Sequence, residues 1–230
     1  MMMTGKVLFI VTNIAGTAKY RFTGYRFIRI LTGGRFFRIN CLPYLFSMAD
    51  ITPGILLISD PFLKDPNFAR TVVFLCEHRE EGSFGFVLNK TYDQELGDLI
   101  KNAEGIRFPV YDGGPVQKDT LHFLHRCPDL IPGGIEVTDG IFWGGDFENV
   151  LVLLKEKKLK KNDIRFFLGY SGWGEGQLNG ELEEKSWITR DAKKELVFNM
   201  NTPQIWKAAL QDLGGEYSRM INYPIDPQLN

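Results

Sequence analysis

A dense run of glycines in the second half of the chain is the feature that most restricts its fold. The segment 169–178, GYSGWGEGQL, contains four glycines and directly follows an apolar stretch, Ile164–Leu168, that predicts a strand. Glycine is concentrated where a backbone turns sharply or approaches other groups closely. We therefore predict a sharp strand-to-helix connection here, in which Trp173 packs while Ser171 and Gln177 contact a ligand.

The same run nearly matches the G-x-S-x-G nucleophile elbow of hydrolases, with Ser171 at the serine position. Trp173 replaces the last glycine of that motif, and its bulk would crowd a strained turn. A catalytic triad in the usual order also needs a histidine after the serine, and His125 is the last histidine of the chain. We therefore assign no catalytic residue.

Charge divides the chain into two physically different parts. Residues 1–47 contain seven of the 27 basic residues and none of the 28 acidic ones, so residues 48–230 carry a net charge of −8. This acidic balance argues against nucleic-acid binding by the larger part. The basic part predicts an N-terminal extension outside the fold, or a reading frame whose true start is Met48. A targeting or membrane-surface segment and a nucleic-acid arm are the alternatives, and no stretch reaches the roughly 18 apolar residues of a membrane helix.

From residue 50 onward, short apolar stretches alternate with turn residues, which predicts hairpins first and mixed strands and helices later. The expected strands are Ile55–Ser59, Val72–Cys76, Phe84–Leu88, Leu121–Leu124, Ile135–Val137, Ile141–Trp143 and Ile164–Leu168. The clearest helices begin after Asp146, at Gln177 and at Thr202-Pro203, and the last one ends at Gly214. This pattern predicts a single α+β domain over residues 48–230.

Three cysteines, Cys41, Cys76 and Cys127, do not form a disulfide framework and favour a reducing, cytoplasmic location. Cys76 and His78 alternate along a predicted strand and would share a face, as would His125 and Cys127. A cross-strand metal site built from these two pairs is an alternative, although the spacing matches no zinc motif. We predict no metal and no cofactor.

Two further segments carry polar groups that suit binding. Asp112-Gly113-Gly114-Pro115-Val116 predicts a turn whose backbone N–H groups could receive an anion, although it lacks the Lys-Ser/Thr of a phosphate-binding loop. Glu77 and His78 could act as a general acid and base. Asn89, which ends the next strand, could form a hydrogen bond across the hairpin.

Several motifs follow one another along residues 52–206: GILLISDP at 54–61, DPNFARTVV at 65–73, Glu77-His78 with GSFGFVLN at 82–89, GGPVQ at 113–117, Leu124-His125 and the glycine run. Together they resemble the YqgE/AlgH family of bacterial proteins. The resemblance implies a compact α+β domain, with a mixed sheet folded into a pseudo-barrel and flanked by helices, in a mostly cytoplasmic protein. The family name implies a link to transcriptional regulation but no established biochemical activity. The family pattern begins near Met48, so residues 1–47 depart from it.

We expect a non-enzymatic cytoplasmic protein that binds a protein or small-molecule partner and has an indirect regulatory role. The surface expected to bind comprises Glu77, His78, Asn89, Gly113, Gly114, Pro115, His125, Ser171, Trp173 and Gln177. Two alternatives are kept. The first is a hydrolase-like or metal-assisted enzyme that uses His78 or His125 with Glu77, and the second is a DNA-binding transcriptional regulator.

Overall fold

The computed structural model describes residues 10–13, 16–22, 27–32, 35–40 and 51–223, in two units that cover residues 1–50 and 51–230. In the first unit, four strands form an antiparallel sheet in the order β1-β2-β3-β4; they are β1 (Ile10–Asn13), β2 (Gly16–Phe22), β3 (Phe27–Thr32) and β4 (Arg35–Asn40). Met48, the alternative start, lies outside the described residues. The proposals made above for residues 1–47 stay predictions.

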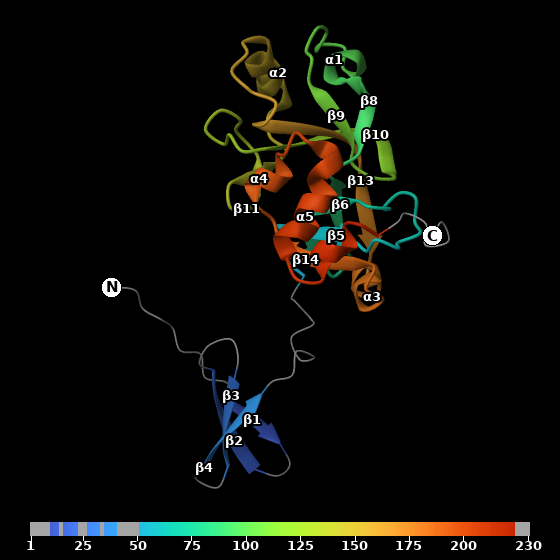
Figure 1. The fold of residues 1–230 in the computed structure, drawn as a ribbon. Coiled ribbons are helices and arrows are strands. Elements are labelled where there is room, and N and C mark those ends of the chain that lie inside the picture. Colours follow the sequence, from blue (N-terminus) through green and yellow to red (C-terminus); the bar gives the residue numbers. More distant parts are fainter. Residues whose placement is uncertain (1–9, 14–15, 23–26, 33–34, 41–50, 224–230) are drawn as a thin grey trace. The chain divides into compact units, whose positions relative to one another are not determined.

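The second unit is built around one large mixed sheet (Figure 1). Its main path runs β11-β12-β10-β13-β7-β6-β5-β14, with β9 paired to β13 and β8 paired to β9. The pairing of β9 with β13 is parallel, and the other pairings of this sheet are antiparallel. The strands are β5 (Ile55–Ser59), β6 (Val72–Arg79), β7 (Gly82–Val87), β8 (Thr91–Glu95), β9 (Pro109–Asp112), β10 (Val116–His125), β11 (Ile135–Thr138), β12 (Ile141–Trp143), β13 (Ile164–Gly174) and β14 (Trp187–Asp191).

The large sheet curls on itself. The rings of Phe84 on β7 and Trp143 on β12 have centroids 4.8 Å apart, although β13 and β10 lie between these strands in the sheet. Gly54, just before β5, lies so close to the end of β11 that an added Cβ would be 2.4 Å from the Cβ of Thr138. Strands from both ends of the order therefore meet across the concave side. The structure confirms the predicted α+β domain with a curled, half-barrel sheet.

The C-terminal helices fill the concave side of this sheet, where α5 lies across β5 and β6 (Figure 1). They are α4 (Lys194–Val197), the short 3₁₀ helix η2 (Thr202–Gln204) and α5 (Ile205–Leu213). Ile205, Trp206, Ala209 and Leu210 recur with the period of a helix, and all four are buried in the same core as the β-strand aromatic side chains. As predicted, the helical segment begins at Thr202-Pro203 and stops at Gly214.

A buried arginine ties the C-terminal helices to the sheet. Arg165 of β13 is 1% exposed, and its guanidinium donates to the carbonyl oxygens of Leu88 and Val197, each at 2.6 Å. The guanidinium carbon also lies 3.9 Å from the ring centroid of Tyr111, a cation–π geometry. Burial lowers the pKa of Arg165 to about 10. The group therefore stays charged at neutral pH, and the carbonyl oxygens and the ring compensate that charge.

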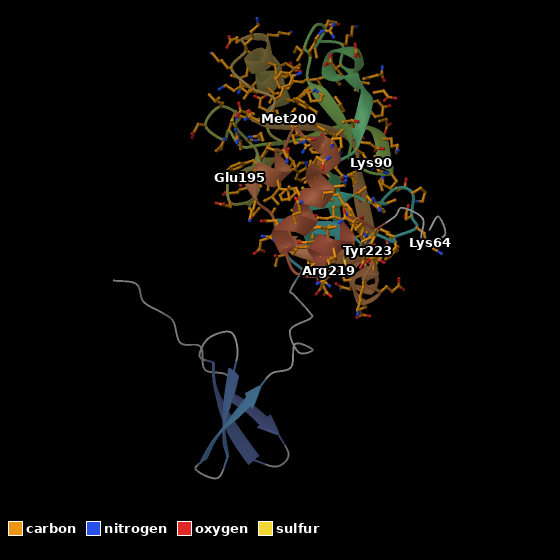
Figure 2. The ribbon with its side chains drawn as sticks, viewed as in Figure 1. Lys64, Lys90, Glu195, Met200, Arg219 and Tyr223 are labelled. Atoms are coloured by element: carbon orange, nitrogen blue, oxygen red, sulfur yellow. The ribbon has the colours of Figure 1, made fainter. Side chains whose placement is uncertain are left out.

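The remaining helices pack outside the concave core. α1 (Leu96–Leu99) and α2 (Phe147–Lys155) cover β9, β10 and β13, and α3 (Gln177–Glu183) covers the strands around β5, β6 and β7. Asp146 caps α2 as predicted, because its side chain accepts the N–H of Asn149 at 3.1 Å. α6 (Tyr217–Met220) follows α5, and Tyr223 beyond it (Figure 2) stacks on Phe62 with ring centroids 5.4 Å apart. Within the described residues, none of the helices has both the length and the apolar character required to span a bilayer.

The glycine run contains the predicted strand-to-helix connection, but the strand before it is longer than expected and the connection is confined to the end of the run. β13 continues through the run to Gly174, and only Glu175 and Gly176 separate it from α3. The glycines allow very close backbone approach within the sheet: a Cβ on Gly113 would lie 2.3 Å from the carbonyl oxygen of Gly169. Gly169 itself has φ of +67°, a conformation that favours glycine. The glycines of this strand therefore mark a place where another backbone approaches closely, which is one of the uses of glycine inside strands.

Candidate functional site

A β-bulge at Cys76 determines which side chains the β6–β7 hairpin presents on each face. The register of the hairpin skips Cys76, which has no partner on β7. The extra residue reverses the alternation of the strand from Glu77 onward. Cys76 therefore packs into the concave core, while His78 lies on the opposite face, directly across from Ser83. For this reason the prediction that Cys76 and His78 share a face is wrong.

His78 and Ser83 form a hydrogen-bonded pair at the edge of a cleft. The Nδ1 atom of His78 is 2.7 Å from the hydroxyl oxygen of Ser83, and Ser83 is 9% exposed. The cleft has a volume of about 360 Å³, within the range of small-molecule sites. It lies between the tip of the β6–β7 hairpin and the turn from β13 into α3. We call it the hairpin cleft; its lining residues are His78, Arg79, Glu80, Ser83, Gly174, Gly176, Leu178 and Asn179.

The lining of the hairpin cleft combines charged side chains of both signs with one apolar side chain. Leu178 is buried and supplies that wall, whereas Asn179 and Glu80 are exposed. The guanidinium of Arg79 lies 2.7 Å from the carboxylate of Glu77, and both side chains are solvent-accessible. Such an exposed ion pair contributes little stability, so a ligand could recruit Arg79 at small cost. The cleft therefore suits a small ligand that has polar groups and a short apolar part.

Asn89 uses both ends of its amide within the fold. Its Oδ1 accepts the backbone N–H of Val72 at 2.8 Å, and its Nδ2 donates to the carbonyl oxygen of Arg70 at 2.8 Å. Arg70 has φ of +53°, which is unfavourable for a residue with a long side chain. The two hydrogen bonds across the β6–β7 hairpin, of the kind the sequence suggested, hold this turn in place.

Gly113, Gly114 and Ser171 belong to the crowded crossing of the β9 turn with β13. Ser171 is fully buried and donates its hydroxyl to the carbonyl oxygen of Gly113 at 3.1 Å. A Cβ on Gly114 would lie 2.4 Å from the carbonyl carbon of Tyr170, so only glycine fits there. Pro115 is exposed beyond this crossing. The backbone around Gly113 and Gly114 is thus engaged in packing.

Trp173 and Gln177 bind the carboxylate of Glu181 on α3. The indole N–H groups of Trp173 and Trp187 donate to one carboxylate oxygen at 2.8 and 2.7 Å. The amide of Gln177 donates to the other oxygen at 2.9 Å. Trp173 is 5% exposed, so it packs as predicted. We call these four residues the carboxylate clamp, which joins α3 to β13 and β14.

His125 does not line the hairpin cleft. It is fully buried at the end of β10, where its Nδ1 accepts the N–H of Cys127 at 3.3 Å and its ring stacks on Phe142. Burial lowers the pKa of His125, so the fold favours its neutral form. Glu77 and His78 are consecutive on a strand and point to opposite faces. The described part of the chain places no three His, Cys, Asp or Glu side chains so that they could hold a metal ion.

The ten residues predicted as one binding surface thus occupy several different environments, and His78 is the one that lines the hairpin cleft. Whether any of them contacts a ligand stays a prediction. Sequence reasoning did not select Ser83, Gly174, Leu178 or Asn179. The hairpin between β6 and β7 could be predicted from the sequence. The pairing of Ser83 with His78 depends on the bulge at Cys76, which no local sequence pattern predicts.

Comparisons with known proteins connect this geometry to a family. A sequence model of the AlgH-like family matches residues 56–218, which include the whole hairpin cleft. The chain is 46% identical over 180 residues to a UPF0301 protein of Chlorobium limicola, a match that covers 78% of this chain and 96% of that protein. It is 43% identical over 181 residues to a UPF0301 protein of Cytophaga hutchinsonii, which covers 78% of this chain and 100% of that protein.

Two solved structures are similar to this one. The solution structure of the AlgH protein from Pseudomonas aeruginosa matches with a TM-score of 0.60 and 28% identity, over 75% of this chain and 94% of that chain. A crystal structure of a protein from Corynebacterium diphtheriae matches with a TM-score of 0.62 and 19% identity, over 80% of this chain and 100% of that chain. At that identity, the second likeness speaks for the fold alone.

Proposed function

Since this chain belongs to the AlgH-like family, we propose that it is a ligand-binding protein, with the hairpin cleft as its site and an indirect regulatory role. The observation that carries the proposal is the wall of the cleft at Gly174. Among the described residues, an added Cβ on Gly174 would meet no atom within 4 Å, and its φ is outside the left-handed region. The fold therefore does not require glycine at this position, and Gly174 lines the hairpin cleft, where a larger side chain would take up space.

The polar groups of the cleft support the same proposal. Asn89, Ser171 and Trp173 use their hydrogen-bonding groups inside the fold. In contrast, His78 and Ser83 are paired with each other at the edge of an open space. A pair of side chains that bond each other beside a cavity can exchange that bond for one to a ligand at little net cost.

A small ligand is favoured over duplex DNA as the direct partner. Residues 48–230 carry a net charge of −8, and binding to the phosphate backbone requires clustered positive charge. The link to transcriptional regulation that the family resemblance implies would be met if ligand occupancy changes the contacts of this protein with another protein. A regulatory effect would then be indirect.

The proposal is tested by a ¹H–¹⁵N NMR titration of the full chain with small carboxylates, phosphates, esters and amides. We expect saturable shifts that are confined to the amides of Ser83, Gly174, Gly176 and Asn179. Gly174→Val adds a branched side chain to the lining of the cleft, at a position where the Cβ meets no atom within 4 Å, and should weaken or abolish these shifts. Gly180→Ala, a substitution on α3 with equal free space but outside the cleft, is the matched control and should leave them unchanged. Equal binding by wild type and Gly174→Val would contradict the proposal.

A further inference from the structure

We propose that Ser83 is a nucleophile activated by His78, and that the hairpin cleft takes small carboxylic esters or thioesters. This inference rests on the proposed function, because the ester must occupy that cleft. It concerns a serine outside the glycine run. Ser171, which nearly matches a hydrolase motif, is fully buried and bonded to a backbone carbonyl.

The geometry of the pair is that of a nucleophile and its base. A separation of 2.7 Å between the Ser83 oxygen and Nδ1 of His78 is a short O–H···N hydrogen bond. In the tautomer that carries its hydrogen on Nε2, the imidazole accepts the hydroxyl proton and raises the nucleophilicity of the serine oxygen. Both residues are fixed by opposite positions on the hairpin, so little motion is needed to keep them aligned.

The bulge at Cys76 gives this pair its position. A regular strand would send His78 toward the concave core and away from Ser83. The bulge re-aims it to the outer face, as bulges beside active sites do. Gly174 and Gly176, in the turn from β13 into α3 that forms one side of the cleft, add no side chain to its lining.

The class of substrate follows from the lining and from the base. Leu178 provides an apolar wall for a short acyl chain, and the side-chain amide of Asn179 can donate to the oxygen that becomes negative. Within residues 51–223, no carboxylate is hydrogen-bonded to His78 to orient it as in a triad. A base without that support suits leaving groups that depart readily, such as alkoxides and thiolates, better than amines.

The reaction needs no oxidant and no cofactor. The Ser83 oxygen forms a bond to the acyl carbon while its proton moves to Nδ1 of His78, and the carbonyl electron pair moves to oxygen. When the carbonyl re-forms, the bond to the alcohol or thiol breaks, and the proton on His78 passes to that leaving group. Water then adds to the acyl-serine with His78 as the base, which releases a carboxylic acid and restores Ser83.

The experiment is labelling of the full chain with a fluorophosphonate, a reagent that modifies nucleophilic serines, followed by intact-mass measurement and peptide mapping. We expect one adduct per chain, on Ser83. His78→Gln should slow labelling by about 100-fold or more, which is the usual contribution of a general base. Ser218→Ala, a serine on α6 outside the cleft, should label at the wild-type rate. Thermal midpoints check that each variant is folded.

A second measurement separates this inference from the proposed function. Acetylation of Ser83 by p-nitrophenyl acetate, seen by mass spectrometry with release of nitrophenolate, supports the nucleophile. An adduct on Ser171 or elsewhere, no adduct at all, or equal rates for wild type and a folded His78→Gln would overturn it. If fragments still shift the cleft amides in the NMR titration while Ser83 stays unmodified, the binding function stands and the nucleophile is refuted.

Discussion

Replacing Glu181 with alanine should strongly destabilise the domain, because the carboxylate clamp loses its acceptor. Two indole N–H groups, on Trp173 and Trp187, would be left without partners, and these tryptophans are only 5% and 4% exposed. An unpaired buried donor costs about 1–3 kcal/mol. Since the carboxylate is partly accessible and water can reach part of the gap, we expect a total loss of about 2–4 kcal/mol. That is a large fraction of the roughly 5–15 kcal/mol that stabilises a typical domain.

Urea unfolding followed by tryptophan fluorescence is a suitable assay, because two of the four tryptophans are in the clamp. With a slope of about 2 kcal/mol per molar urea, the midpoint should fall by about 1–2 M. Glu181→Gln keeps one oxygen that can accept both indole N–H groups and should lose about 1 kcal/mol. Glu183→Ala removes an exposed carboxylate from the same helix and should change little. If Glu181→Ala and Glu183→Ala unfold at the same urea concentration, the reasoning about the clamp is refuted.

Three other predictions follow from single positions. Gly85→Ala would place a Cβ 2.3 Å from a carbonyl oxygen of β6 and should lower the free energy of unfolding by about 1–3 kcal/mol or more. Gly180→Ala, whose Cβ would meet no atom within 4 Å, should raise the free energy of unfolding by up to about 1 kcal/mol. Urea titrations of the two variants check this, and equal effects would contradict it. Burial lowers the pKa of His125 below its ordinary value of about 6.5. The contribution of His125 to the free energy of unfolding should therefore be fully present above about pH 6.5. It should be lost as the pH falls from there toward the lowered pKa of the folded state. Urea titrations between about pH 5 and 8 should show a flatter profile for His125→Gln, and an unchanged profile would count against this assignment. Maleimide should label the half-buried Cys127 in the native protein. It should react with the buried Cys76 only after unfolding, because burial restricts access and raises the pKa of that thiol. Mass mapping that finds both cysteines labelled at the same rate would exclude this difference in access.

Elements with a strong local pattern could be predicted from the sequence. β5 has the predicted bounds, Ile55–Ser59, because five apolar or small residues lie between turn signals. The segment formed by η2 and α5 could be located from Pro203 near its start and Gly214 at its end, together with the helical spacing of the buried residues of α5. In these segments the local preference and the tertiary environment agree, so the sequence pattern alone is sufficient.

The features that could not be predicted depend on residues far apart in the chain. The bulge at Cys76 arises from the register between β6 and β7, and an apolar strand with one extra residue looks like any other apolar strand. Glu181 was overlooked because a charged residue on a short amphipathic helix is normally solvent-exposed. The structural role of Glu181 is evident only when the structure shows that the indole N–H groups of Trp173 and Trp187 both donate to it. The candidate site could therefore be predicted only in part: the sequence pointed to His78 but not to Ser83.

The glycine run has two halves with different physical reasons for their glycines. In the first half, Gly169 has a left-handed φ, and a Cβ added to it would lie 2.7 Å from a carbonyl oxygen of β10. In the second half, Gly176 has a φ of +68° at the start of α3, but Gly174 has neither a special conformation nor a close neighbour. If the run served packing alone, a side chain at Gly174 would be tolerated and would even favour the extended backbone. Gly174 does line the hairpin cleft, so we expect a larger side chain there to reduce the space of the cleft while leaving the packing of β13 unchanged.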